Sequence, residues 1–148
     1  KFFEMVCGNR PENSDVSIIS VDGLSFKRYL EIAKDFRNKK VAVVTDNDSD
    51  YDTKIIEKYR PYDQFDNIQI FSDANNDNRT FEICLYRNNQ ELIDSLKIAN
   101  SRNIQTYMLR EKAEFALRLL EKLEMNNAVD SLQIPEYMKG AIEWVKND

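Results

Sequence analysis

The residues best suited to chemistry are the aspartates that follow one short apolar run. Val41-Ala42-Val43-Val44 leads directly into Thr45-Asp46-Asn47-Asp48-Ser49-Asp50-Tyr51-Asp52. A continuous apolar run of this length predicts a strand that is covered on both faces. Ligands of parallel sheets bind at the carboxyl ends of the strands. Carboxylates crowded there repel one another, and a hard divalent cation relieves that repulsion. We therefore expect Asp46 and Asp48 to bind a metal ion, and Asp50 and Asp52 to begin the next helix.

The chain contains no histidine. Histidine is the commonest general base and a usual zinc ligand, so both roles must pass to other side chains. Hydrolysis through a Ser–His or Cys–His pair is excluded within this chain. Any catalysis must use carboxylates, lysine and a hard cation.

An EF-hand calcium loop is one alternative interpretation of the acidic run. Counted from Asp46, carboxylates occupy loop positions 1, 3, 5 and 7, and Glu57 occupies position 12. Position 6 of such a loop is glycine, because the chain turns sharply there, whereas this chain has Tyr51. A predicted strand, rather than a helix, precedes the run. Both features argue against a calcium loop.

A phosphatase of the haloacid dehalogenase type is a second alternative. In such enzymes a strand ends in Asp-x-Asp and the first aspartate is the nucleophile, a spacing that Asp46 and Asp48 fit. These enzymes usually have a small hydroxyl residue or valine two positions later, where this chain has Asp50. They also need a paired acidic motif late in the sheet, and no such motif is recognisable.

The elements that must position these residues alternate in the first half of the chain and become helical in the second. Strands are predicted at Val16–Val21, Val41–Val44 and Ile68–Phe71. Helices are predicted at Phe2–Cys7, Phe26–Phe36, Tyr51–Tyr59, Thr80–Arg87, Gln90–Ala99, Glu111–Leu123 and Glu136–Val145. Ser25 is the expected N-cap of the helix at Phe26–Phe36, Gly23 lies in the turn before it, and Asn75–Asn78 is expected to form a polar loop. The alternation predicts the α/β class: a small parallel sheet flanked by helices, with a helical C-terminal part.

Composition limits the environment and the partners. The 148 residues are 42% apolar and 32% charged, which predicts one globular domain, and no apolar run approaches the roughly 20 residues of a membrane span. The two cysteines, Cys7 and Cys84, suit a reducing, cytoplasmic location. The net charge of −5 lacks the basic signature of a stand-alone DNA-binding domain. If the chain acts on DNA, metal ions and other domains must supply positive charge.

Five stretches of the chain have an order and spacing that are informative together, although none is specific alone. They are Ser20–Tyr29, Val43–Asp48, Phe71-Ser72 followed by Thr80-Phe81-Glu82, Glu111–Ala116 and Ile134–Val145. On these stretches the whole chain resembles the Toprim (topoisomerase/primase-type, Rossmann-like) domain of the overcoming lysogenization defect (OLD) family of ATP-dependent endonucleases, relatives of the Gabija nuclease.

The resemblance implies a phosphodiesterase site. Asp46 and Asp48 would bind Mg²⁺ or Mn²⁺, Glu82 would add a ligand or orient water, and Lys112 would steady charge at the scissile phosphate. Two divalent ions are expected in the complete protein. Tyr137 and Trp144 are expected to pack in the core rather than to stack on bases.

The family also has a first strand that ends in Glu-Gly, and we expect residues 1–148 to lack it as the C-terminal fragment of a longer ATPase–nuclease. DNA, the parent protein's ATPase domain and a second copy of the chain are the expected partners, and no membrane contact is expected. A degenerate Toprim domain that serves assembly or DNA positioning remains the non-enzymatic alternative.

Overall fold

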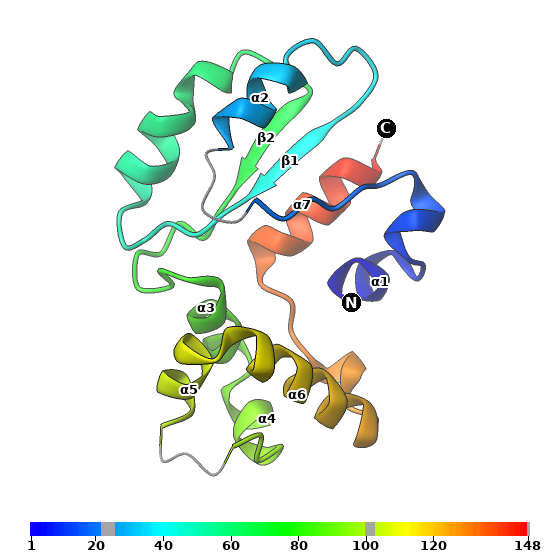
Figure 1. The fold of residues 1–148 in the computed structure, drawn as a ribbon, viewed down its shortest axis with the longest axis vertical. Helices are drawn as coiled ribbons and strands as arrows, with labels where there is room; N and C mark the ends of the chain where they lie inside the picture. Colours follow the sequence, from blue (N-terminus) through cyan, green and yellow to red (C-terminus); the bar gives the residue numbers. More distant parts are fainter. Residues whose placement is uncertain (22–25, 100–102, 148) are drawn as a thin grey trace.

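The sheet of the protein consists of two parallel strands. The computed structural model describes residues 1–21, 26–99 and 103–147. Within them β1 (Val41–Val44) pairs with β2 (Ile68–Phe71), so that Val41 lies opposite Ile68 and Val44 opposite Phe71. The crossover between the strands passes through the π-helix η2 (Asp52–Glu57) and the short 3₁₀-helix η3 (Arg60–Tyr62). The predicted α/β class is confirmed: a small parallel sheet packs against helices, and a helical part follows it (Figure 1).

Alternating side chains of the strands face two different layers. Val43 and Ile68 pack with Leu30 of α2 (Lys27–Ala33) and with Ile55 of η2 in one buried cluster. On the opposite face lies α7 (Glu136–Lys146), where the ring of Phe71 is 6.0 Å from that of Trp144. Successive side chains of a strand point to opposite faces of the sheet, so a strand covered on both faces needs apolar residues at consecutive positions.

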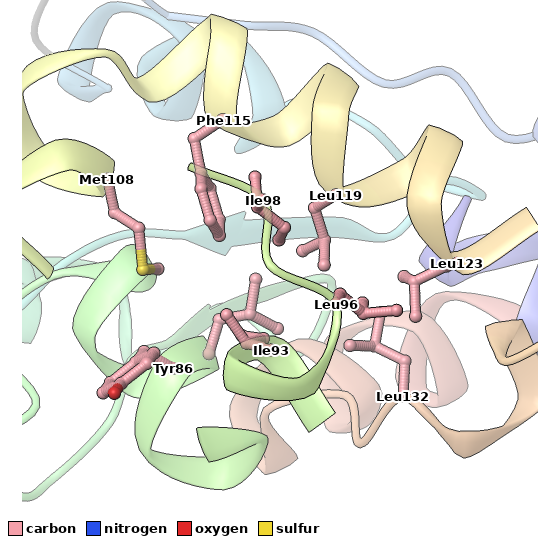
Figure 2. Close-up of a cluster of buried hydrophobic side chains, with 10 residues drawn as sticks. Tyr86, Ile93, Leu96, Ile98, Met108, Phe115, Leu119, Leu123 and Leu132 are labelled. Atoms are coloured by element: carbon pink, nitrogen blue, oxygen red, sulfur yellow. The ribbon is translucent and has the colours of Figure 1, made fainter. Parts of the chain in front are cut away.

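The second half of the chain forms a separate helical cluster. It contains α3 (Phe81–Asn88), α4 (Gln90–Ser95), α5 (Ile104–Arg110), α6 (Lys112–Met125) and the 3₁₀-helix η4 (Val129–Ser131). Apolar side chains from these helices and from the segments that connect them form one core, shown in Figure 2, made of Leu85, Tyr86, Ile93, Leu96, Ile98, Met108, Phe115, Leu119, Leu123 and Leu132.

The prediction of a strand at Val16–Val21 is wrong for the chain as it stands. This segment follows α1 (Phe2–Cys7) and the 3₁₀-helix η1 (Pro11–Ser14), and none of its residues belongs to a helix or a strand. Its β-branched composition suits a strand, yet Ile18 and Ile19 are 73% and 63% exposed. A strand needs a neighbour for its backbone hydrogen bonds, and among the described residues β1 pairs only with β2.

The other predicted elements are present with small shifts. The helix predicted at Gln90–Ala99 ends early as α4, because Lys97 adopts a left-handed backbone conformation with φ of 47°. Helix α5, which we did not predict, fills the stretch before α6. The predicted roles of Gly23 and Ser25 fall outside the described residues. Across the described ranges, no helix is both long and apolar enough to cross a membrane.

Candidate functional site

Asp46 lies two residues beyond the end of β1, at the start of α3. Its Oδ1 accepts a hydrogen bond of 2.7 Å from the backbone N–H of Phe81, the first residue of α3. The Oγ1 of Thr80 caps the same helix by accepting from Ile83 N–H at 3.4 Å. A carboxylate at a helix N-terminus is favourable, since the unpaired N–H groups carry partial positive charge. Asp46 therefore anchors the loop after β1 to the first turn of α3.

The electrostatic surroundings of Asp46 contain the other predicted site residues. Burial raises the pKa of Asp46 above its ordinary value, and the Phe81 N–H partly opposes this shift. The charges of Glu82 and Asp48 raise the pKa further, whereas that of Lys112 lowers it. A carboxylate that is costly to ionise at such a position gains from a cation that binds beside it.

Glu82 and Lys112 form an ion pair beside Asp46. The Nζ of Lys112 lies 3.0 Å from Oε1 of Glu82. Glu82 is buried, while the side chain of Lys112 is about half exposed. The second carboxylate oxygen, Oε2, is buried and has no hydrogen-bond partner among the described residues. An unpaired buried oxygen costs stability, so a site with a further polar or cationic partner would relieve it.

Asp48 is held differently from Asp46. It is exposed, and its backbone has a φ of 50°, followed by 67° at Ser49. Its N–H donates to the carbonyl of Arg79 at 3.1 Å. The loop thus turns sharply after Asp46, and Asp48 contributes to the site through the effect of its charge on Asp46.

A buried asparagine fixes this loop. Asn47 is 1% exposed, and its Nδ2 donates to the carbonyls of Asp73 (2.7 Å) and Asn75 (2.9 Å). Its Oδ1 accepts from Ser49 N–H at 2.8 Å. Asn47 therefore joins the segment after β1 to the segment after β2. Asp50 is a structural residue, as expected, because its Oδ1 accepts from Thr53 N–H at 3.2 Å where the following helix begins.

The sequence predicted no role in the site for three side chains that lie near it: Asp73, Cys84 and Tyr137. Asp73 lies two residues after β2, as Asp46 does after β1, and its Oδ2 accepts from Cys84 Sγ at 3.2 Å. Burial tends to raise the pKa of Asp73, but hydrogen bonds from Asn75 N–H, Asn78 and Cys84 together hold it below its ordinary value. The equal spacing from the two strands was the signal in the sequence that could have identified Asp73.

Cys84 and Tyr137 stay protonated beside these carboxylates. Burial, followed by the hydrogen bond to Asp73, raises the pKa of the Cys84 thiol to about 12. Burial and the charge of Asp46 raise the pKa of the Tyr137 hydroxyl. Both groups are neutral at physiological pH, so neither adds charge to the carboxylates around them.

The donor set suits a hard cation but does not form a complete cage. Within residues 1–21, 26–99 and 103–147, no group of three or more His, Cys, Asp or Glu side chains is arranged to hold a metal ion. Mg²⁺ is commonly bound through only one or two carboxylates, with water and substrate filling the other positions. Asp46 and the free oxygen of Glu82 have the chemistry for that kind of binding.

Comparison with known families identifies the segment that leads to this site. Residues 1–48 match the family model of the overcoming lysogenization defect protein-like TOPRIM domain. This N-terminal third carries the resemblance to OLD-like TOPRIM domains. No curated protein and no solved structure matches the chain.

The matched segment covers only part of the site. It runs from α1 through β1 and ends on Asp48, so both aspartates of the Asp-x-Asp motif belong to the OLD-like TOPRIM match. Glu82 and Lys112 lie beyond it, and their place beside Asp46 comes from the structure alone. TOPRIM domains of this kind are associated with nucleases and divalent metals.

Proposed function

We propose that this chain is the TOPRIM part of a metal-dependent DNA endonuclease that hydrolyses phosphodiester bonds. The observation that carries the proposal is that Asp46 lies near enough to the Glu82–Lys112 ion pair for both of these charges to shift its pKa. Asp46 lies in the segment that matches the OLD-like TOPRIM family, whereas the pair comes from two helices outside it. Independent segments of the chain thus supply the residue types that phosphodiester hydrolysis requires.

The chain's own residues would divide the work as follows. Asp46 and Glu82 would hold Mg²⁺ or Mn²⁺ through carboxylate oxygens, with Asp48 adding negative charge at the exposed side of the loop. Such an ion, when bound, supplies an activated water and neutralises charge on the phosphate. Lys112 would turn from Glu82 to the phosphate, because its exposed ammonium group is a compact charge on a flexible stem.

The partners are also part of the proposal. A net charge of −5 leaves DNA binding dependent on the metal ions and on basic surfaces outside residues 1–148. We infer a second divalent ion in the complete protein, together with an ATPase domain and a second copy of the chain.

Nicking of supercoiled plasmid in Mg²⁺ or Mn²⁺ tests the proposal, with the chain both alone and extended at its N-terminus by its natural upstream residues. Asp46→Asn and Lys112→Gln should each lower the nicking rate by about 10²-fold or more, as loss of one charge-stabilising group does in other enzymes. Asp52→Asn, in the same acidic run, and Lys122→Gln, on the same helix as Lys112, are matched controls that should nick at the parent rate.

Binding of Mn²⁺ by calorimetry separates a structural failure from a catalytic one. Asp46→Asn should weaken Mn²⁺ binding, whereas Lys112→Gln should leave binding intact or strengthen it by freeing Glu82. If both variants nick as fast as the parent, the catalytic assignment is wrong. Turnover of a small phosphate ester without nicking would instead favour the phosphatase alternative.

The second candidate is a TOPRIM domain that positions DNA or assembles its parent protein without cutting. The Glu82–Lys112 ion pair is also compatible with it, because such a pair can join α3 to α6 without any metal ion. DNA binding that neither Mn²⁺ nor the Asp46→Asn substitution changes would support this candidate.

A further inference from the structure

A pocket lies between α1, α3, α6 and η4, against the core of the helical region. Its volume is about 290 Å³, close to the lower limit of roughly 300 Å³ for small-molecule sites. Lys112 and Ala116 line it and are exposed, so the pocket reaches solvent along α6. Eleven of its fourteen lining residues are apolar, and five of these belong to the core in Figure 2: Leu85, Phe115, Leu119, Leu123 and Leu132.

Aromatic rings form part of the pocket wall. Phe2 of α1 and Phe81 of α3 lie edge to face with their ring centroids 5.9 Å apart, and Phe115 comes from α6. The thioether of Met5 also lines the pocket. Rings prefer edge-to-face or offset contacts with other rings, and a thioether packs well against the edge of a ring. This wall therefore suits a flat aromatic molecule.

The volume of the pocket sets the size of that molecule. An apolar cavity of about 150 Å³ stays dry and binds benzene. The pocket beside α6 has about twice this volume, which corresponds to two fused rings. A protein partner would instead bury about 800 Å² on each side of an interface, which is a much larger surface than this pocket presents. The pocket is therefore matched to one small molecule.

One polar group of the pocket wall has a free acceptor. Glu82 lines the pocket, is only 9% exposed, and places Oε1 3.0 Å from the Nζ of Lys112. Its Oε2 is buried and has no hydrogen-bond partner among the described residues. The last torsion of a glutamate side chain is broad, so a rotation of the carboxylate turns Oε2 towards a ligand at low cost. A ligand that fits this pocket therefore carries a hydrogen-bond donor.

The charges of the pocket favour a donor that is itself uncharged. Lys112 already balances the charge of Glu82, so a cationic ligand would be repelled by the ammonium group. An anionic ligand would face the Glu82 carboxylate in a mostly apolar pocket, where an unpaired charge is costly. An N–H or O–H on an aromatic ring supplies the missing hydrogen bond without either penalty.

We propose that this pocket binds a free, uncharged molecule of two fused aromatic rings that carries one N–H or O–H group, and that this group donates to Oε2 of Glu82. The rings would lie among the side chains of Phe2, Phe81 and Phe115. Binding of such a molecule goes beyond phosphodiester hydrolysis and does not depend on it. Because the proposed metal ion uses the same carboxylate, the ion and the aromatic molecule would compete for Glu82.

Indole, which has two fused rings and one N–H, is a suitable probe. In NMR titrations of the chain, the ring current of bound indole should shift the methyl resonances of Leu85, Leu119 and Leu123 but not that of Ile55 beside the sheet. Indene has the same shape with a CH₂ group in place of the N–H. It should bind about tenfold more weakly or worse, because a hydrogen bond to a charged group is lost. Titration in EDTA keeps this result independent of the proposed metal site.

Substitution on α6 locates the bound molecule. Ala116→Phe adds a ring at the exposed rim of the pocket and should weaken indole binding by about tenfold or more, because the new ring occupies the space of the ligand. Ala113→Phe is the matched control, since Ala113 is exposed on the same helix but does not line the pocket. This variant should bind indole as the parent chain does.

Several results would overturn the proposal. They are the absence of shifts at the pocket methyl groups, equal affinity for indole and indene, and unchanged indole binding by the Ala116→Phe variant. Tighter binding of N-acetyltryptophanamide than of indole would also overturn it, because the occupant would then be a side chain of a polypeptide rather than a free molecule.

Discussion

The sheet region and the helical region bury their apolar residues to different degrees. Ten buried side chains close the core of the helical region, whereas seven form the core beside the sheet, and large apolar residues near β1 remain exposed. The helical region has the larger buried core, while in the sheet region grooves lie along both β1 and β2. The site lies where the two regions meet: Asp46 follows β1 of the sheet region, and Glu82 belongs to α3 of the helical region.

Matched core truncations should reveal this difference, and they carry the largest expected change in stability. Ile93 of α4 is 1% exposed in the helical core, and Ile55 of η2 is 4% exposed beside an open cavity along β2. Ile93→Ala should lower the free energy of unfolding by about 4 kcal/mol, and Ile55→Ala by about 2–3 kcal/mol, because a site that water or neighbours can fill costs less. Urea unfolding measures both.

The neighbouring Ile56 provides the control for these truncations. It is 46% exposed, so Ile56→Ala should change the free energy of unfolding by less than about 0.5 kcal/mol. A larger loss from Ile55→Ala than from Ile93→Ala would show that the sheet region, not the helical one, is the more tightly packed.

Each region also contains a buried asparagine, and the two should differ in their effect on the site. Asn89 donates to the carbonyls of Leu85 and Gln133 and accepts from Gln133 N–H, far from Asp46 in the sequence. Asn47 fixes the loop that carries Asp46. Replacement of either by Ala should cost about 2–3 kcal/mol, because buried backbone groups lose their partners.

Only Asn47→Ala should also weaken Mn²⁺ binding, since it frees the loop after β1 from the loop after β2. Calorimetry at a temperature where both variants remain folded makes the comparison. Equal Mn²⁺ affinity in the Asn47→Ala and Asn89→Ala variants would argue that the loop does not position a metal ligand.

The two strands of the sheet were predictable because the local sequence alone indicates a strand at each place. Val41–Val44 is an apolar run and Ile68–Phe71 is apolar except for Gln69; polar residues bound both segments, and both form with the predicted bounds. Val16–Val21 is also rich in β-branched residues, yet none of its residues belongs to a strand. Strand propensity describes a fit to a pleated, half-buried surface, so it cannot report whether that surface exists.

The candidate site was predictable in part for a related reason. Asp46 follows a strand and was found by its position, whereas the roles of Glu82 and Lys112 came from family resemblance. Their ion pair joins two helices, and such tertiary proximity leaves no local periodicity in the sequence. Asn47 was missed because a loop asparagine in the sequence gives no sign that its amide will be buried against two carbonyls.

The smallest effects concern the two aspartates that follow the two strands, Asp46 and Asp73. Hydrogen bonds lower the pKa of Asp73 in the folded protein, so its carboxylate stabilises the fold above the unfolded pKa, and this stabilisation is lost as pH falls through the folded pKa. Asp73→Asn places an amide against the Nδ2 of Asn78 and should cost about 1 kcal/mol at pH 7. The cost should shrink as the solution becomes acidic.

Asp46 should behave in the opposite sense. Its folded pKa is raised, so its ionised form opposes folding above that pKa, and the penalty disappears below the unfolded value of about 4. Asn can still accept from Phe81 N–H, so Asp46→Asn should raise the melting temperature at pH 7 by about 1–2 °C, a small gain because the side chain is partly solvated. Melting curves from pH 3.5 to 8 without divalent ions test this sign. Added Mn²⁺ should then stabilise the parent but not Asp46→Asn, which separates a carboxylate kept for a cation from one kept only to cap α3.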